Sequence, residues 1–220
     1  MIRSLRIFII AATLLSASQA SIIFTNLGPG KSYDVTQGNP VGNDFAGDNA
    51  AQGDTFTPTV TATLTSIELA LSCVVSCPAP ESFTVAITKS SADAPAAVIE
   101  SFSFNGITLG GLGNNNPLVT ATSALHPVLT AGTQYWITVS SSVSFAIAWN
   151  DNSTGDPSDQ AISSDGGVTW FSPSGMTPSA YEVDGTTSSG VPEPSTTVLF
   201  GSAVLVGLFA LRRPLRQSNR

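Results

Sequence analysis

Apolar and polar residues alternate along the central part of the chain, in segment after segment between residues 21 and 185. A period of two places every second side chain on the same face of a β-strand, and no window here shows a convincing helical period. The clearest apolar stripes are Phe83, Val85 and Ile87; Val98, Phe102 and Phe104, with Glu100 among them; Tyr135, Ile137 and Val139; and Val143, Phe145, Ile147 and Trp149. The pattern predicts a body built from β-strands.

One stretch changes its parity partway along, between residues 60 and 71. The apolar positions are even before the change and odd after it: Val60, Ala62 and Leu64, then Ile67, Leu69 and Leu71. One extra residue in a strand shifts every later side chain to the opposite face. The parity change therefore predicts a β-bulge or a strand break near Thr65 and Ser66.

Turn-forming residues separate the stripes at short intervals. Clusters of Gly, Asn, Asp, Ser or Pro occur at residues 91–95, 105–106, 110–117, 131–132, 150–157 and 165–167. Many short strands with this punctuation are typical of an antiparallel β-sandwich, and we expect a jelly-roll-like one over residues 21–185. About 165 residues are enough to enclose one hydrophobic core. Residues 186–195, rich in Gly, Ser and Thr at first, are predicted to be a flexible linker.

Residues 1–20 have the composition of a secretory signal peptide. Arg3 and Arg6 form a basic start, residues 7–15 are apolar, and Ser18 and Ala20 supply the small residues of a cleavage site. The apolar run is about half the ~20 residues that a membrane span needs, which disfavours a permanent anchor. We expect export across the inner membrane and cleavage by signal peptidase after Ala20.

The C-terminal end has three parts in a fixed order. Residues 191–195 read Val-Pro-Glu-Pro-Ser, residues 196–211 carry no charge, and residues 212–220 contain four arginines. The uncharged segment predicts a single transmembrane helix of ~24 Å, which snorkelling arginines can extend across the bilayer. Arginines beyond the helix favour a cytoplasmic C-terminus, and they disfavour a GPI signal, whose apolar tail is normally terminal.

This order resembles the PEP-CTERM sorting signal of Gram-negative bacteria. Pro192, Glu193 and Pro194 fall on its motif, and Arg212 and Arg213 fall on its basic tip. The resemblance implies recognition by exosortase, a membrane enzyme that processes such chains near the motif before release or re-anchoring. A plain tail anchor, with Val-Pro-Glu-Pro as a stiff linker, is the alternative.

The body resembles the choice-of-anchor R domain, a family of secreted bacterial domains with differing C-terminal anchors. The matching stretches are residues 26–33, 54–58, 64–71, 131–136 and 148–155. The family has no established activity, so the resemblance implies an architecture and a destination outside the cell, and no reaction.

Charge is distributed very unevenly along the chain. Residues 21–190 contain 2 basic and 14 acidic residues, a net charge of −12, with Lys31 and Lys89 as the basic ones and no arginine. Nucleic-acid affinity comes largely from Lys and Arg replacing counterions on phosphates. The body is therefore not expected to bind nucleic acid, nor to hold a substrate through an arginine.

Cys73 and Cys77 are the two cysteines of the chain. Two thiols in an exported protein usually pair. Four residues of straight strand would separate their Cα atoms by ~13 Å, too far for a bond that needs less than ~7 Å, so the chain must turn between them. We expect a structural disulfide. Two cysteines and one distant His126 do not complete a zinc site.

Several other patterns suggest ligand sites. Asp44, Asp48 and Asp54, with Asn49, could offer oxygens to calcium, although their spacing is not that of an EF-hand and a solvated acidic loop is the simpler interpretation. Residues 28–32 (Gly-Pro-Gly-Lys-Ser) are predicted to be a turn, because Thr25 occupies the position where a P-loop has its first glycine.

Residues 163–170 fit the pattern Ser-x-Asp-x-Gly-x-Thr-Trp of the Asp box known from sialidases. Sialidases use several copies of this motif and a cluster of arginines, whereas residues 21–190 contain one copy and no arginine, which excludes sialidase activity. The single copy predicts a β-hairpin with Trp170 packed over the turn. With no Gly-x-Ser-x-Gly motif and a single histidine, nothing indicates an enzyme, and no cofactor is expected.

Trp136 and Trp170 are the possible sugar-stacking side chains, since Trp149 shares the face of a predicted core stripe. The sequence therefore predicts a non-enzymatic protein of the cell envelope or extracellular matrix. Its expected partners are signal peptidase, exosortase and the membrane. The alternative is a carbohydrate-binding module for extracellular polysaccharide.

Overall fold

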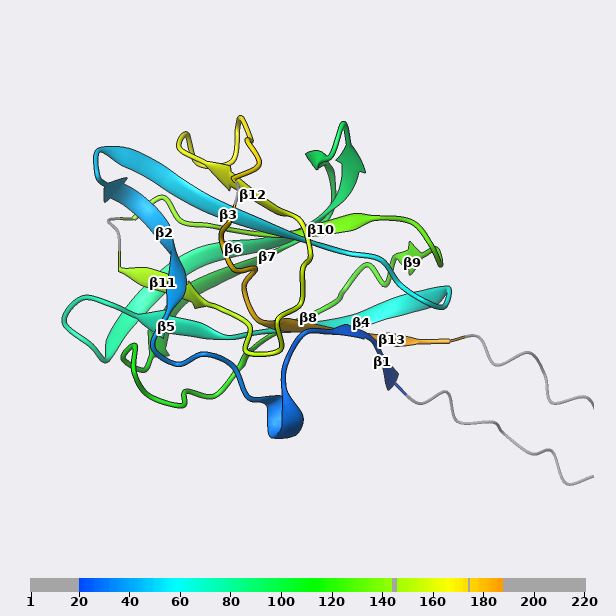
Figure 1. Cartoon of the computed structure of the whole chain (residues 1–220), viewed down its shortest axis with the longest axis horizontal. Helices are drawn as coiled ribbons and strands as arrows, with labels where there is room; N and C mark the ends of the chain where they lie inside the picture. Colours follow the sequence, from blue (N-terminus) through cyan, green and yellow to red (C-terminus); the bar gives the residue numbers. More distant parts are fainter. Residues whose placement is uncertain (1–19, 144–145, 174, 188–220) are drawn as a thin grey trace, which may run out of the picture. The chain divides into compact units, whose positions relative to one another are not determined.

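The computed structural model describes residues 20–143, 146–173 and 175–187, which include the whole predicted body except three positions (Figure 1). Residues 1–19 of the predicted signal peptide, the predicted sorting motif and the predicted helix at residues 196–211 lie outside these residues. Within the described part, no helix is long and apolar enough to cross a membrane.

The described residues form an all-β unit with one short 3₁₀ turn, η1 (Pro29–Lys31). The strands are β1 (Ala20–Thr25), β2 (Gly38–Phe45), β3 (Asp48–Phe56), β4 (Ala62–Leu69), β5 (Leu71–Cys73), β6 (Ala79–Ser91), β7 (Ala94–Leu109), β8 (Val119–Thr122), β9 (Val128–Leu129), β10 (Tyr135–Ser140), β11 (Ile147–Asn150), β12 (Gln160–Ser163) and β13 (Tyr181–Thr186).

These strands make two antiparallel sheets. The smaller has the order β1-β13-β4-β8, with β9 also on β4, and the larger has the order β5-β11-β2-β3-β10-β6-β7. The larger sheet curls into a half-barrel. Strand β2 pairs with β3 near their hairpin turn, and β12 then pairs with β3 over Ala51–Asp54. The predicted all-β, antiparallel body is confirmed.

The core lies between the two sheets and contains most of the predicted stripes. The fully or nearly fully buried members are Phe83, Val85 and Ile87 of β6, Tyr135, Ile137 and Val139 of β10, Ile147 and Trp149 of β11, and Leu64, Ile67 and Leu69 of β4. Opposite β4, Asp184 pairs with Ser66 and the next residue, Gly185, pairs with Leu64. Thr65 is the extra residue, so the bulge expected from the change in parity is confirmed.

Strand β7 departs from its predicted pattern. Val98 is 61% exposed, whereas Glu100 is 4% exposed, because the register with β6 shifts between Ile87 and Thr88. The predicted turn at residues 105–106 is also wrong: this dipeptide is an irregularity inside β7, with Gly106 at φ +66°. Val143 is largely exposed, and Phe145 lies outside the described residues.

Glu100 is buried where an apolar residue was expected, and the loop after β8 accounts for it. The carboxylate accepts hydrogen bonds from the Ser123 hydroxyl (2.7 Å) and from the backbone amides of Ala124 (2.7 Å) and Leu125 (3.0 Å). Burial alone would raise the pKa of Glu100, but these donors outweigh it and lower the pKa. The buried charge therefore fixes the loop.

Lys31, on the predicted turn at residues 28–32, balances two acids of the smaller sheet. Glu182 of β13 lies directly opposite Glu68 of β4, an unfavourable pairing of like charges. The Lys31 ammonium forms ion pairs with both carboxylates, at 3.0 Å from Glu182. The hydrogen bond to Glu68 is the largest cause that raises the pKa of Lys31, from 10.5 to about 12.

We predict that Lys31→Met destabilises the fold by about 1 kcal/mol, because it leaves the nearly buried Glu182 facing Glu68 without a cation. The pKa of Lys31 is raised on folding, so its contribution is complete below pH 10.5 and is lost as the pH rises through about 12. Urea unfolding at neutral pH measures the change. Lys89→Met, at an exposed lysine outside both ion pairs, is the control; an equal loss in both variants would contradict the prediction.

Candidate functional site

The cysteine pair is bonded as predicted. Cys73 and Cys77 form a disulfide with their Cα atoms 5.6 Å apart, and the chain turns between them with Ser76 at φ +56°. The backbone of Cys73 also bonds to Gly110 and Leu112 of the neighbouring loop, at 2.8 Å each. The disulfide thus fixes a loop beside another turn, and Cys73 is buried beyond the reach of a ligand.

Trp136 is not the exposed sugar platform that the sequence allowed. Its side chain is 0% exposed, and its indole N–H donates to the Ser90 hydroxyl at 3.1 Å. The face of the larger sheet that carries Trp136 is covered here. The Trp136 ring and Pro95 both occupy the space directly above Gly53 of β3. A glycan cannot stack on this tryptophan.

The single Asp box forms the predicted hairpin. Ile162 and Phe171 exchange backbone hydrogen bonds of 2.8 and 2.9 Å, and the half-buried Trp170 ring packs over Gly167. Asp165 holds the turn by accepting from the amides of Val168 (3.0 Å) and Thr169 (2.8 Å), with further bonds from side-chain hydroxyls. The Thr169 amide is the largest cause that lowers the pKa of Asp165, to about 2.

The acidic segment considered as a calcium candidate is a β-hairpin, so its aspartates do not converge. Asp44 is on β2, with its side chain outside what the structure describes, and Asp48 begins β3 as an exposed residue. Asp54 lies six residues further along β3, at ~20 Å of strand from Asp48, and is 0% exposed. Among the described residues, no three His, Cys, Asp or Glu side chains gather as metal ligands.

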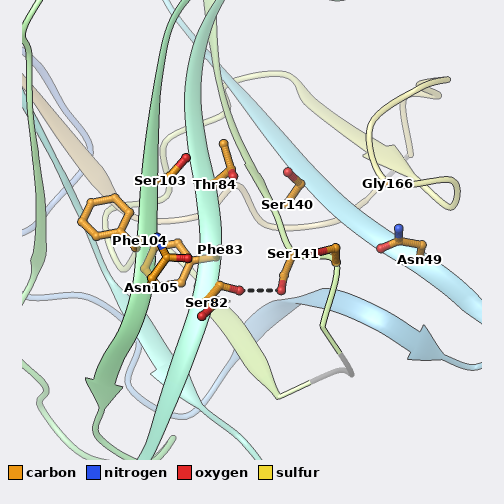
Figure 2. A pocket seen from close by; sticks show the side chains of 11 residues that line it. Asn49, Ser82, Phe83, Thr84, Ser103, Phe104, Asn105, Ser140, Ser141 and Gly166 are labelled. Carbon is orange, nitrogen blue, oxygen red and sulfur yellow. Dashed lines mark hydrogen bonds between the residues drawn. The ribbon is translucent and has the colours of Figure 1, made fainter.

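A hydroxyl-lined pocket lies on the larger sheet (Figure 2). Ser103, Thr84 and Ser140 are aligned across β7, β6 and β10, because Thr84 pairs with Ser103 on one side and with Ser140 on the other. The hollow has a volume of about 240 Å³, and no charged side chain lines it. The complete lining is Asn49, Ser82, Phe83, Thr84, Ser103, Phe104, Asn105, Ser140, Ser141, Ser142 and Gly166.

The Asp box supplies one wall of this pocket. The Gly166 amide donates to the Asn49 carbonyl at 2.8 Å, and the Asn49 amide donates to the Ser164 carbonyl at 2.9 Å. The Oδ1 atom of Asn49 is buried without a hydrogen-bond partner. The rings of Phe83 and Phe104 stack on the core face of the same strands, with centroids 4.8 Å apart, and support the floor of the pocket from behind. Uncharged hydroxyl and amide groups in a hollow can bind hydroxylated, neutral ligands.

Sequence reasoning did not find this pocket. Its hydroxyl groups occupy the polar positions of strands whose apolar positions form the core, and alternation alone does not distinguish a solvated face from a binding face. The cross-strand register that aligns Thr84, Ser103 and Ser140 becomes visible only when the pairing of the strands is known.

Comparison with known proteins identifies the C-terminal segment. Residues 190–213 match the PEP-CTERM protein-sorting motif. The match contains all five predicted sorting residues, namely Pro192, Glu193, Pro194, Arg212 and Arg213, and it implies an exported protein that exosortase processes. It does not extend into the body, so the choice-of-anchor R domain stays a prediction. No curated protein matches the chain.

We predict that Asp165→Asn loosens the Asp-box wall of the pocket while the fold is retained. The substitution removes the charge that strengthens the two amide bonds to Oδ1, and the new amide nitrogen cannot accept the bond that Oδ2 receives from the Thr169 hydroxyl. Hydrogen exchange at those two amides should become several-fold faster. The folded-state pKa of Asp165 is lowered, so the wild-type loop should keep its protection above pH 3.8 and lose it as the pH falls through about 2. Unchanged exchange in the variant would contradict this role.

Proposed function

We propose that the chain is a non-enzymatic protein of the cell surface or extracellular matrix, delivered there by two processing steps. The match to the PEP-CTERM motif carries this proposal. The predicted signal peptide exports the chain, and the predicted helix at residues 196–211 holds it, with its C-terminus cytoplasmic, while exosortase acts near Pro192–Pro194. What remains is a β-sheet body of the choice-of-anchor R type, with a jelly-roll-like course.

The fold is compatible with the removal of both terminal segments. Strand β1 pairs with β13 along the smaller sheet, with Ala20 opposite Thr186. Cleavage after Ala20 would leave β1 its pairing from Ser21 onward, and cleavage beyond β13 would leave both sheets complete. The two processed ends of the body would then lie on neighbouring strands, β1 and β13.

The sorting role can be tested in the producing cells with the double variant Pro192→Ala/Pro194→Ala. If exosortase recognises the motif, the full-length variant should accumulate in the inner-membrane fraction, and the shortened mature form should be strongly reduced. Ser195→Ala, which changes the residue next to the motif, is the matched control and should process like the wild type. Normal processing of the double variant would sink the proposal.

The alternative role, binding of extracellular polysaccharide, is supported by one observation: the pocket of Figure 2 is lined by hydroxyl and amide groups and carries no charge. A hollow of about 240 Å³ is smaller than the ~300–1,000 Å³ of drug-sized sites and would hold one ring of a longer chain. The net charge of −12 over residues 21–190 repels anionic polymers, so the ligand class we propose is a neutral polysaccharide.

Affinity electrophoresis of the processed protein in gels with a neutral glucan, or with the producing organism's exopolysaccharide, tests this role. Ser103→Glu places a long anionic side chain in the pocket and should abolish retardation by the polysaccharide. Ser101→Glu, at an exposed site on the same face of β7 but outside the pocket lining, should leave it intact. Equal retardation of the two variants would exclude this pocket as the site.

A further inference from the structure

A group of buried polar side chains occupies the interior where β2, β3 and β12 meet the chain before β13. We call it the polar compartment, and its members are Asn39, Gln52, Asp54, Gln160 and Ser179. Gln52, Asp54 and Phe56 are every second residue of β3, so their side chains lie on the same face, the one that Phe56 turns to the core. Gln160 of β12 pairs directly with Asp54. Each of the five side chains is at least nine-tenths buried.

The compartment holds an unusual number of polar atoms without a partner. Five of the eight such buried side-chain atoms found in the described residues belong to Gln52, Asp54 and Gln160. They are Oε1 of Gln52, both carboxylate oxygens of Asp54, and the amide nitrogen and oxygen of Gln160. Oxygens outnumber nitrogens by four to one. Because buried polar groups in folded proteins are almost always satisfied, this set indicates something electropositive that the protein chain does not supply.

The surrounding charges have the same sign. Burial is the main cause that raises the pKa of Asp54, and the nearby Asp151 and Asp156 raise it further. The hydroxyl and backbone amide of Ser179 lie close enough to oppose the rise, but neither makes a hydrogen bond of normal geometry to the carboxylate. Asp151, whose carboxylate receives the Asn39 amide at 3.2 Å, has its own pKa raised to about 6 by burial and by Asp34. Neither lysine of the described chain acts on Asp54, since Lys31 is held by Glu68 and Glu182 and Lys89 is exposed.

A cleft lies next to this compartment at Gln160. This residue helps to line a hollow of about 450 Å³, together with residues 155–159, 172–173 and 175–178, and the lining also includes Asp93. The amide of Gln134 reaches toward Asp93 (3.3 Å) and Asp159 (3.5 Å). Gln160 thus lies between a cleft whose lining includes Asp93, Asp156 and Asp159 and the buried carboxylate of Asp54.

We propose that the polar compartment is a calcium site in which Asp54 supplies the carboxylate and Gln52 and Gln160 supply amide oxygens. A buried carboxylate without the set of donors that Glu100 has is either protonated or paired with a cation. A proton on Asp54 would offer one donor to several orphan oxygens, whereas one cation accepts many oxygens at once. Calcium tolerates irregular sets of carboxylate, amide and backbone oxygens completed by water, and magnesium demands a near-ideal octahedron. The aspartates that line the cleft concentrate cations there.

The test uses the processed protein after chelator treatment and dialysis, with CaCl₂ as the probe in about 150 mM NaCl to screen the acidic surface. We expect saturable heat by calorimetry with one ion per chain. At about ten times the Kd, the melting temperature should rise by about 3–6 °C. MgCl₂ should give a clearly smaller shift at the same concentration.

Asp54→Asn removes the charge and keeps the size, and it should abolish both signals. Gln160→Leu should weaken calcium binding about tenfold or more. Asp48→Asn, on the exposed start of the same strand, is the matched control and should bind calcium like the wild type. If Asp54→Asn does not fold, Gln160→Leu and the wild-type titration decide.

Three results would overturn the proposal. The first is no heat and no thermal shift in wild type up to about 10 mM CaCl₂, which lies beyond the weakest extracellular sites. The second is an equal response to magnesium and calcium, which would show screening of the acidic surface. The third is calcium binding by Asp54→Asn or Gln160→Leu that equals the wild type.

Discussion

The scarcity of positive charge is the constraint on which the rest of this structure depends. Residues 21–190 hold 14 acids and two lysines, so most carboxylates must be stabilised by something other than an ion pair. Lys31 serves two of them, Glu68 and Glu182. Others are stabilised by backbone amides and hydroxyl groups. The carboxylates of Glu100 and Asp165 accept such bonds and thereby fix the conformation of the loops that donate them. The loop conformations therefore depend on the carboxylates that the loops stabilise.

That constraint also connects the fold to the two sites that we propose for ligands. Asp165 holds the Asp-box turn, the turn bonds to the backbone of Asn49, and Asn49 lines the hydroxyl pocket of Figure 2. Asp54 is the acid that neither amides nor lysines stabilise fully, and the oxygens around it make the polar compartment. An uncharged pocket and an acidic compartment on one body are consistent with the neutral and cationic ligands that we propose.

Local signals predicted the parts of the structure that depend on one strand at a time. The alternation in β6 and β10, the bulge at Thr65 and the turn between Cys73 and Cys77 each follow from the spacing of a few residues. The failures depend on pairing between strands. Val98 and Glu100 exchange roles because β7 slips against β6. The burial of Trp136 could not be predicted, because a covered face of a sheet has the same sequence pattern as an open one. Gln52, Asp54 and Gln160 come together only through the register of β12 on β3.

The chain consists of a body, a predicted signal peptide and a C-terminal sorting segment, and six of its eight basic residues belong to the two terminal segments. The pairing of β1 with β13 brings the ends of the body together, so both segments can be removed without opening a sheet. The measurement that tests this division most directly is the intact mass, with both terminal sequences, of the mature protein from fractionated cells and medium. The account predicts a chain that begins at Ser21 and ends before Thr196. A mature membrane form that still ends at Arg220 would contradict it and would leave an ordinary tail-anchored protein.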